Sequence, residues 1–326
     1  MLGACQVMIP VIVTELEYHK GEEVFTSADG FRCIATPSNE EALAEQVRRT
    51  GAKYVIIGFD KYVGPLYDAL PRGGVIARFG VGHDGVDKKK ANAKGIYCTN
   101  TPGVLDQSVA ECGIGLILNA ARHIPTCAED NRKGVWQARI GLELSGKTLA
   151  IIGCGAIGKR TASIATFGFG MVVIGFDIVE PVDGPKYGIG NFTTDFARAV
   201  NNADFVSLHI PDMTTTKNFI NDARLADMPR RAVLINTARG GVVDEDALYD
   251  AIVAGRIAGA ALDVFKTEPY VPQSPAKDLR TLDRVIMTPH IGSSTKEACR
   301  RMARAALGNI EHAVAGEHGR MSIVTR

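Results

Sequence analysis

The sequence predicts an α/β protein that contains two doubly wound parallel-sheet domains. Short apolar runs alternate with helical stretches along most of the 326 residues, and this alternation is typical of parallel sheets covered by helices on both faces. One apolar run is followed directly by the glycine motif G-x-G-x-x-G, at Gly153, Gly155 and Gly158. A chain of this length with 46 % hydrophobic residues is expected to form two domains.

The first hundred residues predict one α/β domain. Its predicted strands are the apolar runs at 7–13, 31–35, 54–57, 75–78 and 96–99. The helices predicted between them lie at 39–50, 64–70 and 87–93. We do not expect this domain to bind a dinucleotide.

The segment 78–87, RFGVGHDGVD, follows the fourth of these strands and contains Gly80, Gly82 and Gly85. Successive backbone amides in such a loop can form a concave anion site, and ligands of open α/β sheets bind beyond the carboxyl ends of strands. A plain strand-to-helix turn explains the same glycines equally well. Both interpretations stay open on these residues alone.

Residues 147–177 predict a dinucleotide site. After the apolar run 148–152, Gly153 permits a tight turn, Gly155 lets backbone amides approach a pyrophosphate, and Gly158 lets the next helix pack closely. The phosphates are expected at the N-terminus of that helix. A second run ends at Asp177, 19 residues after Gly158. A carboxylate there accepts hydrogen bonds from ribose hydroxyls and repels a 2′-phosphate, so NAD is favoured over NADP.

Composition and charge exclude other classes of partner. A net charge of +1 gives no general attraction to nucleic acid or anionic membranes. No apolar run approaches the roughly 20 residues that span a bilayer, so no membrane association and a cytoplasmic location are expected. The seven cysteines form no C-x-x-C pair, which argues against a metal site and against structural disulfides. Cys154, inside the glycine loop, is interpreted as a small residue that fits there.

The chain passes into its second domain near TNTPG, residues 99–103. A helix is predicted at 108–121. Its sequence, which includes ECGIGLILNAA, is too apolar for a solvated surface, so the helix lies either in the core or at a subunit interface. Trp136, the only tryptophan, is expected to be a packing anchor rather than a catalytic residue.

Polar segments follow the remaining predicted strands, which lie at 205–209, 232–235, 260–262 and 285–287. The ends of parallel strands converge on one crevice, where Arg239, Glu268 and His290 could meet. Histidine can protonate a developing alkoxide, a neighbouring carboxylate favours the imidazolium, and arginine can bind a carboxylate bidentately. Taken singly, the three residues could equally be a surface cation, a loop acid and a core histidine.

The motifs GCGAIG, NTARGG, LDVFKTEP and TPHIG, in this order, resemble the D-isomer-specific 2-hydroxyacid dehydrogenase family. The resemblance covers nearly the whole chain, including RFGVGHDGVD and NTPGVLDQSVAE. It implies that Arg239, Glu268 and His290 are the catalytic trio. It also implies a Rossmann NAD-binding domain, residues 103–292, inserted into a flavodoxin-like substrate domain formed by residues 1–102 and 293–326.

The same resemblance implies the ligand contacts. The substrate would be bound by Val81 and Gly82, through their amides, and by Arg239 and Ser293. Asp263 would hold the nicotinamide carboxamide. The implied cofactor-binding residues are Val109, Gly153, Gly155, Ala156, Ile157, Gly158, Asp177, His209, Pro211, Thr216, Thr237, Ala238, Asp263, His290 and Gly292. A homodimer is implied, with the helix after Ser108 at its interface.

The resemblance predicts an NAD-dependent oxidoreductase that transfers a hydride between NAD(H) and a small D-2-hydroxy or 2-keto acid. Phosphoglycerate dehydrogenase-like members and glyoxylate or hydroxypyruvate reductases are the most similar within the family. For a phosphate-bearing substrate, only Lys61 in the segment GFDKY could meet the phosphate. A further alternative is an NAD-responsive binding protein like the corepressor-type relatives, which can keep the same trio.

Overall fold

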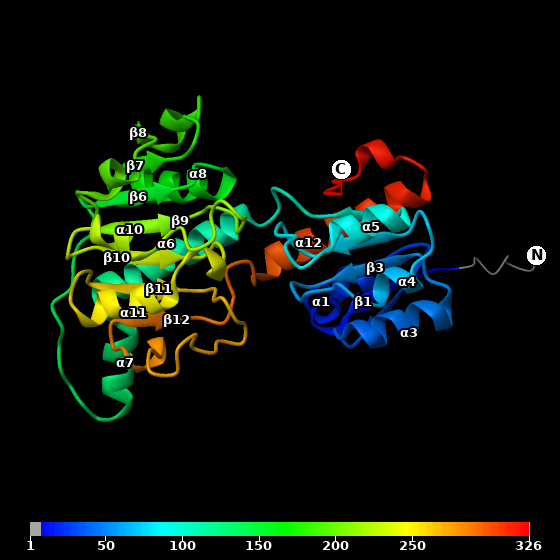
Figure 1. The fold of residues 1–326 in the computed structure, drawn as a ribbon, viewed down its shortest axis with the longest axis horizontal. Coiled ribbons are helices and arrows are strands. Elements are labelled where there is room, and N and C mark those ends of the chain that lie inside the picture. The colour runs from blue at the N-terminus through cyan, green and yellow to red at the C-terminus, as the bar shows by residue number, and fades with distance from the viewer. Residues whose placement is uncertain (1–7, 326) are drawn as a thin grey trace, which may run out of the picture. The chain divides into compact units, whose positions relative to one another are not determined.

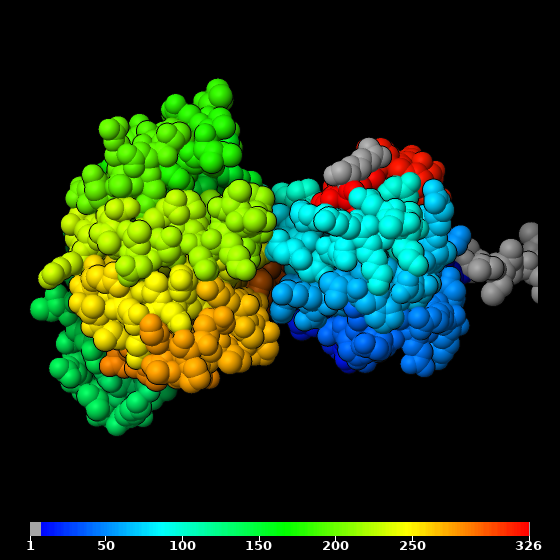
Figure 2. Space-filling model, in the orientation of Figure 1, coloured from blue at the N-terminus to red at the C-terminus, as the bar shows by residue number. Residues whose placement is uncertain are grey.

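The computed structural model describes residues 8–325, so Cys5, Val7 of the first predicted strand and the outermost residues of the predicted substrate domain lie outside the described residues. The chain forms two units (Figures 1 and 2). Unit 1 combines the residues up to Leu105 with those from Thr295 onward, and unit 2 is the continuous segment from Asp106 to Ser294. Each unit is built around one parallel sheet.

The sheet of unit 1 has five parallel strands in the order β2-β1-β3-β4-β5. They are β1 (Ile9–Thr14), β2 (Phe31–Thr36), β3 (Tyr54–Ile57), β4 (Val75–Arg78) and β5 (Tyr97–Thr99). This is the flavodoxin-like order, whose topological switch point lies between β1 and β3. The predicted strands are therefore confirmed, with ends that differ by no more than two residues.

Helices cover both faces of this sheet (Figure 1). They are α1 (Glu15–Lys20), α2 (Glu22–Thr26), α3 (Glu40–Thr50), α4 (Leu66–Ala69), α5 (Lys88–Lys94), α12 (Lys296–Val314) and the short η5 (His318–Arg320). The last residues pair with β5, since the amide of Val324 donates to the carbonyl of Cys98 (2.8 Å). Figure 2 shows this C-terminal segment, in red, against the cyan part of unit 1. Unit 1 is thus completed by the C-terminal end of the chain.

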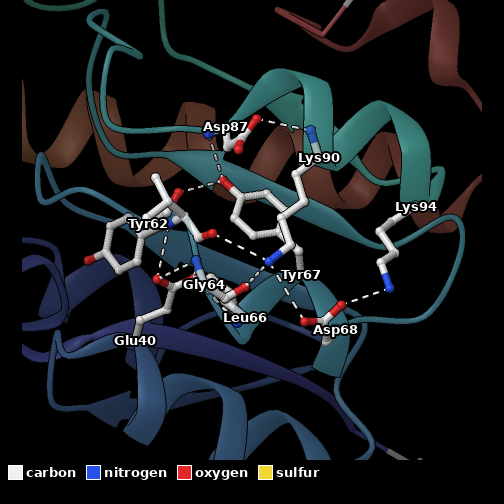
Figure 3. A network of polar contacts seen from close by, with 10 residues as sticks. Glu40, Tyr62, Gly64, Leu66, Tyr67, Asp68, Asp87, Lys90 and Lys94 are labelled. Atoms are coloured by element: carbon white, nitrogen blue, oxygen red, sulfur yellow. Dashed lines mark hydrogen bonds and ion pairs between the residues drawn. The ribbon is translucent and has the colours of Figure 1, made fainter.

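A network of hydrogen bonds fixes the loop between β3 and α4 (Figure 3). The Glu40 carboxylate accepts from the amides of Val63 (3.0 Å) and Gly64 (2.8 Å). From the other side, Lys90 Nζ donates to the Gly64 carbonyl (2.7 Å), and the Tyr67 hydroxyl donates to the Tyr62 carbonyl (2.9 Å). Amides and carbonyls of one short loop are therefore both satisfied by side chains, which holds the loop in one conformation.

The sheet of unit 2 has seven parallel strands in the order β12-β11-β10-β9-β6-β7-β8. They are β6 (Thr148–Ile152), β7 (Val172–Phe176), β8 (Ile189–Thr193), β9 (Phe205–Leu208), β10 (Val233–Asn236), β11 (Gly259–Leu262) and β12 (Val285–Met287). This is the Rossmann order with one further strand, and the switch point lies between β6 and β9. The predicted fold class of two doubly wound parallel sheets is confirmed. The edge strand β8 was not predicted, because its sequence IGNFT contains no continuous apolar run and is only partly buried.

Helices cover this second sheet on both faces (Figure 1). They are α6 (Asp106–Arg122), α7 (Ile124–Arg132), α8 (Ala156–Ser163), α9 (Phe196–Val200), α10 (Asp222–Ala226) and α11 (Glu245–Val253), with short turns η1 (Ile164–Gly168), η2 (Gly184–Tyr187), η3 (Gly240–Val242) and η4 (Leu279–Thr281). Ile114, Leu116 and Ile117 of α6 are buried in one apolar cluster that also contains residues of β6, β9, β10 and β11. The apolar face of this helix therefore belongs to the core.

The segment after α7 differs from the prediction. Trp136 was expected to be a packing anchor, but its side chain is 92 % exposed, and Ile140 is 98 % exposed. The reason is that α7 and the chain after it run along the outside of unit 2 (Figure 1), and the ion pair of Arg139 with Asp130 (2.8 Å) joins this segment to α7 rather than to the core. Within unit 2, the Trp136 side chain is therefore not packed into the core.

No helix among the described residues is both long enough and apolar enough to cross a membrane.

Candidate active site

The glycine loop lies at the carboxyl end of β6, beside the switch point of the sheet. Gly153 has φ +102°, a conformation that favours glycine. A Cβ on Gly158 would overlap the carbonyl oxygen of Gly153, so α8 starts in direct contact with the loop. A Cβ on Gly155 would have no atom within 4 Å among the described residues. Open space at Gly155, directly before Ala156 and Ile157 in the first turn of α8, fits the pyrophosphate of a dinucleotide.

Asp177 follows β7 and is held by two backbone amides. Its Oδ2 accepts from Cys154 N (2.8 Å), and its Oδ1 accepts from Ile178 N (2.7 Å). Each carboxylate oxygen keeps a further lone pair, so the group can still accept from ribose hydroxyls. Cys154 is buried against Gly175, and burial raises the pKa of its thiol to about 12. Its packing agrees with the interpretation that it is a small space-filling residue.

His209, at the end of β9, is held in the fold by its backbone amide, which donates to the carbonyl of Ile152 (2.7 Å). Its Nε2 lies 2.9 Å from Ser207 Oγ. Burial lowers the pKa of His209 to about 4, so its ring is neutral near neutral pH. The Thr216 hydroxyl donates to the Pro211 carbonyl (2.5 Å) and closes the turn after this strand.

The segment after β10 carries Arg239. Asn236 folds it, because its Nδ2 donates to the Arg239 carbonyl (2.9 Å) and its Oδ1 accepts from Ala238 N (3.0 Å). The hydroxyl of Thr237 is buried and has no hydrogen-bond partner among the described residues, as expected of a group that meets a ligand. Asn236 was missed in the sequence, although it stands inside the motif NTARGG.

Asp263 connects the ends of β11 and β12. Its carboxylate, 1 % exposed, accepts from Thr288 Oγ1 (2.5 Å) and from the amides of Ile291 (2.9 Å) and Gly292 (2.8 Å). These bonds define the path of the chain around His290, which has φ +53°. A Cβ on Gly292 would lie 3.7 Å from the methyl carbons of Val109 on α6. Asp263 therefore has an evident structural function, and one Oδ2 lone pair remains for a ligand.

His290 and Glu268 form a hydrogen-bonded pair. His290 Nδ1 lies 2.7 Å from Glu268 Oε2, and the two side chains are 25 % and 20 % exposed. Glu268 Oε1 accepts from Phe265 N (3.0 Å). Burial of Glu268 favours its neutral form, but the hydrogen bond and charge of His290, the Phe265 amide and the charge of Arg239 together hold the pKa of Glu268 below its ordinary value. Glu268 is therefore ionised at neutral pH and keeps Nδ1 of the imidazole as the donor.

Val81 and Gly82 belong to unit 1, in the loop after β4, and both are half-buried. The Val81 carbonyl accepts from Asn100 Nδ2 (2.8 Å). A Cβ on Gly85 would overlap the carbonyl oxygen of Asp60, so this loop and the loop after β3 touch through their backbones. Ser293 belongs to unit 2, directly after Gly292, and is also half-buried. The structure thus places the predicted substrate residues in both units.

A histidine paired with an ionised glutamate at the strand ends of a Rossmann sheet defines a class, the nicotinamide-dependent dehydrogenases. Residues 114–292 match the model of the NAD-binding domain of the D-isomer-specific 2-hydroxyacid dehydrogenases. The chain belongs to this family. The predicted family, the predicted class of NAD-dependent D-2-hydroxyacid dehydrogenase and the predicted cofactor are therefore confirmed. 

Named relatives agree with this assignment. The chain is 43 % identical over 231 residues to a hydroxypyruvate reductase of Thermotoga maritima, with 70 % of this chain and 73 % of the relative covered. A glyoxylate reductase of Korarchaeum cryptofilum is 36 % identical, with 84 % and 82 % covered. A D-3-phosphoglycerate dehydrogenase of Methanocaldococcus jannaschii is 35 % identical over 95 % of this chain but only 58 % of the relative.

Solved structures agree in fold. A D-lactate dehydrogenase of Aquifex aeolicus, complexed with NAD and lactic acid, matches with a TM-score of 0.83 at 27 % identity, over 97 % of this chain and 99 % of that one. An NADPH-dependent glyoxylate/hydroxypyruvate reductase of Sinorhizobium meliloti, in complex with NADP and malonate, matches with a TM-score of 0.82 at 28 % identity, with 97 % of each chain covered. The fold therefore serves both nicotinamide cofactors.

Proposed function

We propose that this NAD-dependent oxidoreductase acts on a short 2-keto acid, with glyoxylate and hydroxypyruvate as its best substrates. The names of two relatives, each matched over more than two thirds of its length, support these substrates. The observation that carries the chemistry is the pair of His290 Nδ1 with Glu268 Oε2 at 2.7 Å. With Nδ1 occupied by the carboxylate, Nε2 is the ring atom that exchanges a proton with the substrate.

The proposed roles of the trio follow from their charges. Arg239 binds the carboxylate of the 2-keto acid and polarises its carbonyl group. Glu268, ionised, favours the imidazolium of His290, whose Nε2 gives its proton to the carbonyl oxygen as the 2-hydroxy group forms. Bound NADH supplies the hydride. In the reverse direction, neutral His290 takes the proton from the hydroxyl group.

The remaining ligand contacts are part of the proposal. Val81 and Gly82 offer amides to the substrate carboxylate, and Ser293 lies beside the substrate. The proposed cofactor residues are Val109, Gly153, Gly155, Ala156, Ile157, Gly158, Asp177, His209, Pro211, Thr216, Thr237, Ala238, Asp263, His290 and Gly292. NAD is preferred to NADP, because the chain offers an acid, Asp177, where a 2′-phosphate would lie. Unit 1 is accordingly the substrate-binding domain and unit 2 the NAD-binding domain.

A homodimer and a cytoplasmic location complete the proposal. The exposed apolar side chains of Trp136 and Ile140 on the segment after α7 support a surface that a second copy covers. Such a dimer would give Trp136 the packing that unit 2 lacks. The mass of the protein in solution tests the dimer, and Trp136→Ser is expected to weaken association of the two copies. The six described cysteines are free thiols, the state that a reducing compartment maintains.

The substrate is tested by NADH oxidation with glyoxylate, hydroxypyruvate, pyruvate, longer 2-keto acids and 3-phosphohydroxypyruvate, with NADPH in parallel. Highest kcat/KM with glyoxylate or hydroxypyruvate supports the proposal. Preference for 3-phosphohydroxypyruvate would favour the phosphoglycerate dehydrogenase alternative and a phosphate-binding role for Lys61. Tight NADH binding without turnover of any acid would instead indicate a binding protein.

The role of His290 is tested by His290→Ala. We expect kcat to fall at least about 100-fold and the Kd of NADH to change by no more than about twofold. The control is His312→Ala, because His312 makes a similar pair with Glu317 (2.9 Å) on unit 1 and should leave kcat unchanged. Loss of NADH binding, with activity per bound enzyme retained, would refute the role.

A further inference from the structure

The segments that carry Arg239 and Glu268 are in direct backbone contact. A Cβ on Gly240, the residue after Arg239, would overlap the carbonyl carbon and oxygen of Phe265 and the amide nitrogen of Lys266. No side chain separates the two segments there, so a displacement of the 264–268 loop is transmitted directly to the neighbouring segment. Whatever fixes the amides of Phe265 and Lys266 therefore also fixes the position of Glu268.

Two carboxylates bind these successive amides. Phe265 N donates to Glu268 Oε1 (3.0 Å), and Lys266 N donates to Glu245 Oε1 (2.7 Å). Glu245 lies in the first turn of α11, directly after the cap residue Asp244, and is only 4 % exposed. Its other oxygen, Oε2, is buried and has no hydrogen-bond partner within residues 8–325.

A buried carboxylate with one unsatisfied oxygen destabilises a fold, which suggests that its remaining hydrogen bond has a function. Burial raises the pKa of Glu245; the amide and charge of Lys266 act against this, while the charges of Asp246 and Asp244 add to it. Glu245 is not the cap of α11, because Asp244 caps this helix by accepting from Ala247 N (3.2 Å). Among the described residues, the Lys266 amide is the one hydrogen-bond donor to the buried Glu245 carboxylate.

We propose that Glu245 is a positioning residue for the reaction: it fixes the 264–268 loop so that Glu268 meets His290. This inference rests on the proposed roles of that pair. Because the amides of Phe265 and Lys266 belong to adjacent residues, loss of the Lys266 bond lets the loop move and lengthens the Glu268–His290 contact. Glu245 itself is assigned no contact with substrate or cofactor.

The helix offers a matched control. Asp246 lies one residue further along the same turn and also has a buried oxygen without a hydrogen-bond partner among the described residues. Its other oxygen accepts from Ser274 Oγ (2.5 Å), outside the 264–268 loop. Asp246→Ala therefore removes a half-satisfied carboxylate from the same place without releasing Lys266.

The test compares Glu245→Ala, Glu245→Gln and Asp246→Ala by nuclear magnetic resonance titration of histidine ring carbons, with the His290 signal assigned by its absence in His290→Asn. A carboxylate held beside the imidazole favours its protonated form. We therefore expect the His290 titration midpoint to fall by about one pH unit in Glu245→Ala and to stay unchanged in the other two variants. Glu245→Gln should behave as wild type because its amide oxygen can still accept from Lys266 N.

Kinetics give the second readout. In Glu245→Ala, kcat should fall about tenfold or more, with KM for the keto acid and the Kd of NADH within about twofold. An unchanged His290 midpoint in Glu245→Ala, or the same shift in Asp246→Ala, would overturn the inference. The titration does not require turnover. If the wild-type protein reduces no 2-keto acid, the proposed function is refuted, but the titration still shows whether Glu245 positions Glu268.

Discussion

Two loops of this chain share the spacing G-x-G-x-x-G, but their glycines have different structural functions. The first loop, after β4, contains Gly80, Gly82 and Gly85. The second loop, after β6, contains Gly153, Gly155 and Gly158. In the second loop a Cβ on Gly155 would meet open space. In the first loop a Cβ on Gly85 would overlap the carbonyl of Asp60. Gly155 therefore lies beside open space, whereas Gly85 is packed against a neighbouring loop.

The residues that follow each glycine motif distinguish the two loops. After Gly155 the chain enters α8 at once, and the next strand ends at Asp177, which binds the amide of Cys154. After Gly85 the chain reaches α5 only at Lys88, and Asp87 caps that helix with its own carboxylate. A helix N-terminus without such a cap remains available for phosphate. Glycine spacing alone therefore does not identify a dinucleotide site.

The largest expected effect is at Gly158. In Gly158→Ala the new methyl group overlaps the Gly153 carbonyl, so the loop or α8 must shift. The unfolding free energy should fall by about 3 kcal/mol, and NADH binding should be lost with it. Urea unfolding and NADH fluorescence measure both. Gly190→Ala on β8, where the methyl meets open space, is the control. Equal stabilities of the two variants would show that the close approach at Gly158 is unimportant.

A pH-dependent effect is expected beside the same loop, where the His209 backbone lies against Gly153. Burial lowers the folded-state pKa of His209 to about 4, while the unfolded value is about 6.5. The unfolded state therefore binds a proton first, and stability is lost as pH falls from about 6.5 to about 4, by at most about 3 kcal/mol. In His209→Gln this loss is absent, so the stability difference between wild type and variant should change across that window. A constant difference would contradict the lowered pKa of His209.

The loop after β4 should respond differently. Gly85→Ala places a methyl group against the Asp60 carbonyl in unit 1, so the unfolding free energy should fall by about 2 kcal/mol. NADH affinity should stay the same, because the cofactor motif lies in unit 2. Urea unfolding and NADH titration of one preparation check both expectations. Weaker NADH binding in a folded variant would mean that this loop, too, contacts the cofactor.

The strands and the cofactor loop could be predicted from the sequence because their signals are local. Buried parallel strands read as continuous apolar runs, and β3, β4, β6 and β12 were predicted with their observed ends. The short polar helices α1 and α2 carry no such run and were missed. Trp136 was misjudged because an apolar side chain was assumed to pack within its own unit.

The residues that support the site could not be predicted because their partners are distant in sequence. Glu245 binds the amide of Lys266, 21 residues away, and in the sequence it looks like an ordinary acid at a helix start. Asp263 was predicted as a ligand contact, while its bonds to Thr288, Ile291 and Gly292 depend on β11 and β12 being neighbours. Local motifs reveal the reacting groups, and only the sheet order reveals what holds them.

The smallest expected effect is at Gly155, and it separates the two loops most sharply. In Gly155→Ala the methyl group meets no protein atom within 4 Å among the described residues, so the unfolding free energy should change by less than about 1 kcal/mol. The same methyl group would stand where backbone amides approach the pyrophosphate, so the Kd of NADH should rise about tenfold, or about 1.4 kcal/mol. Gly85→Ala is the natural counterpart, because it should lose stability and keep its affinity. If Gly155→Ala binds NADH as wild type does, the open space beside this glycine is not the route by which the phosphates reach the loop.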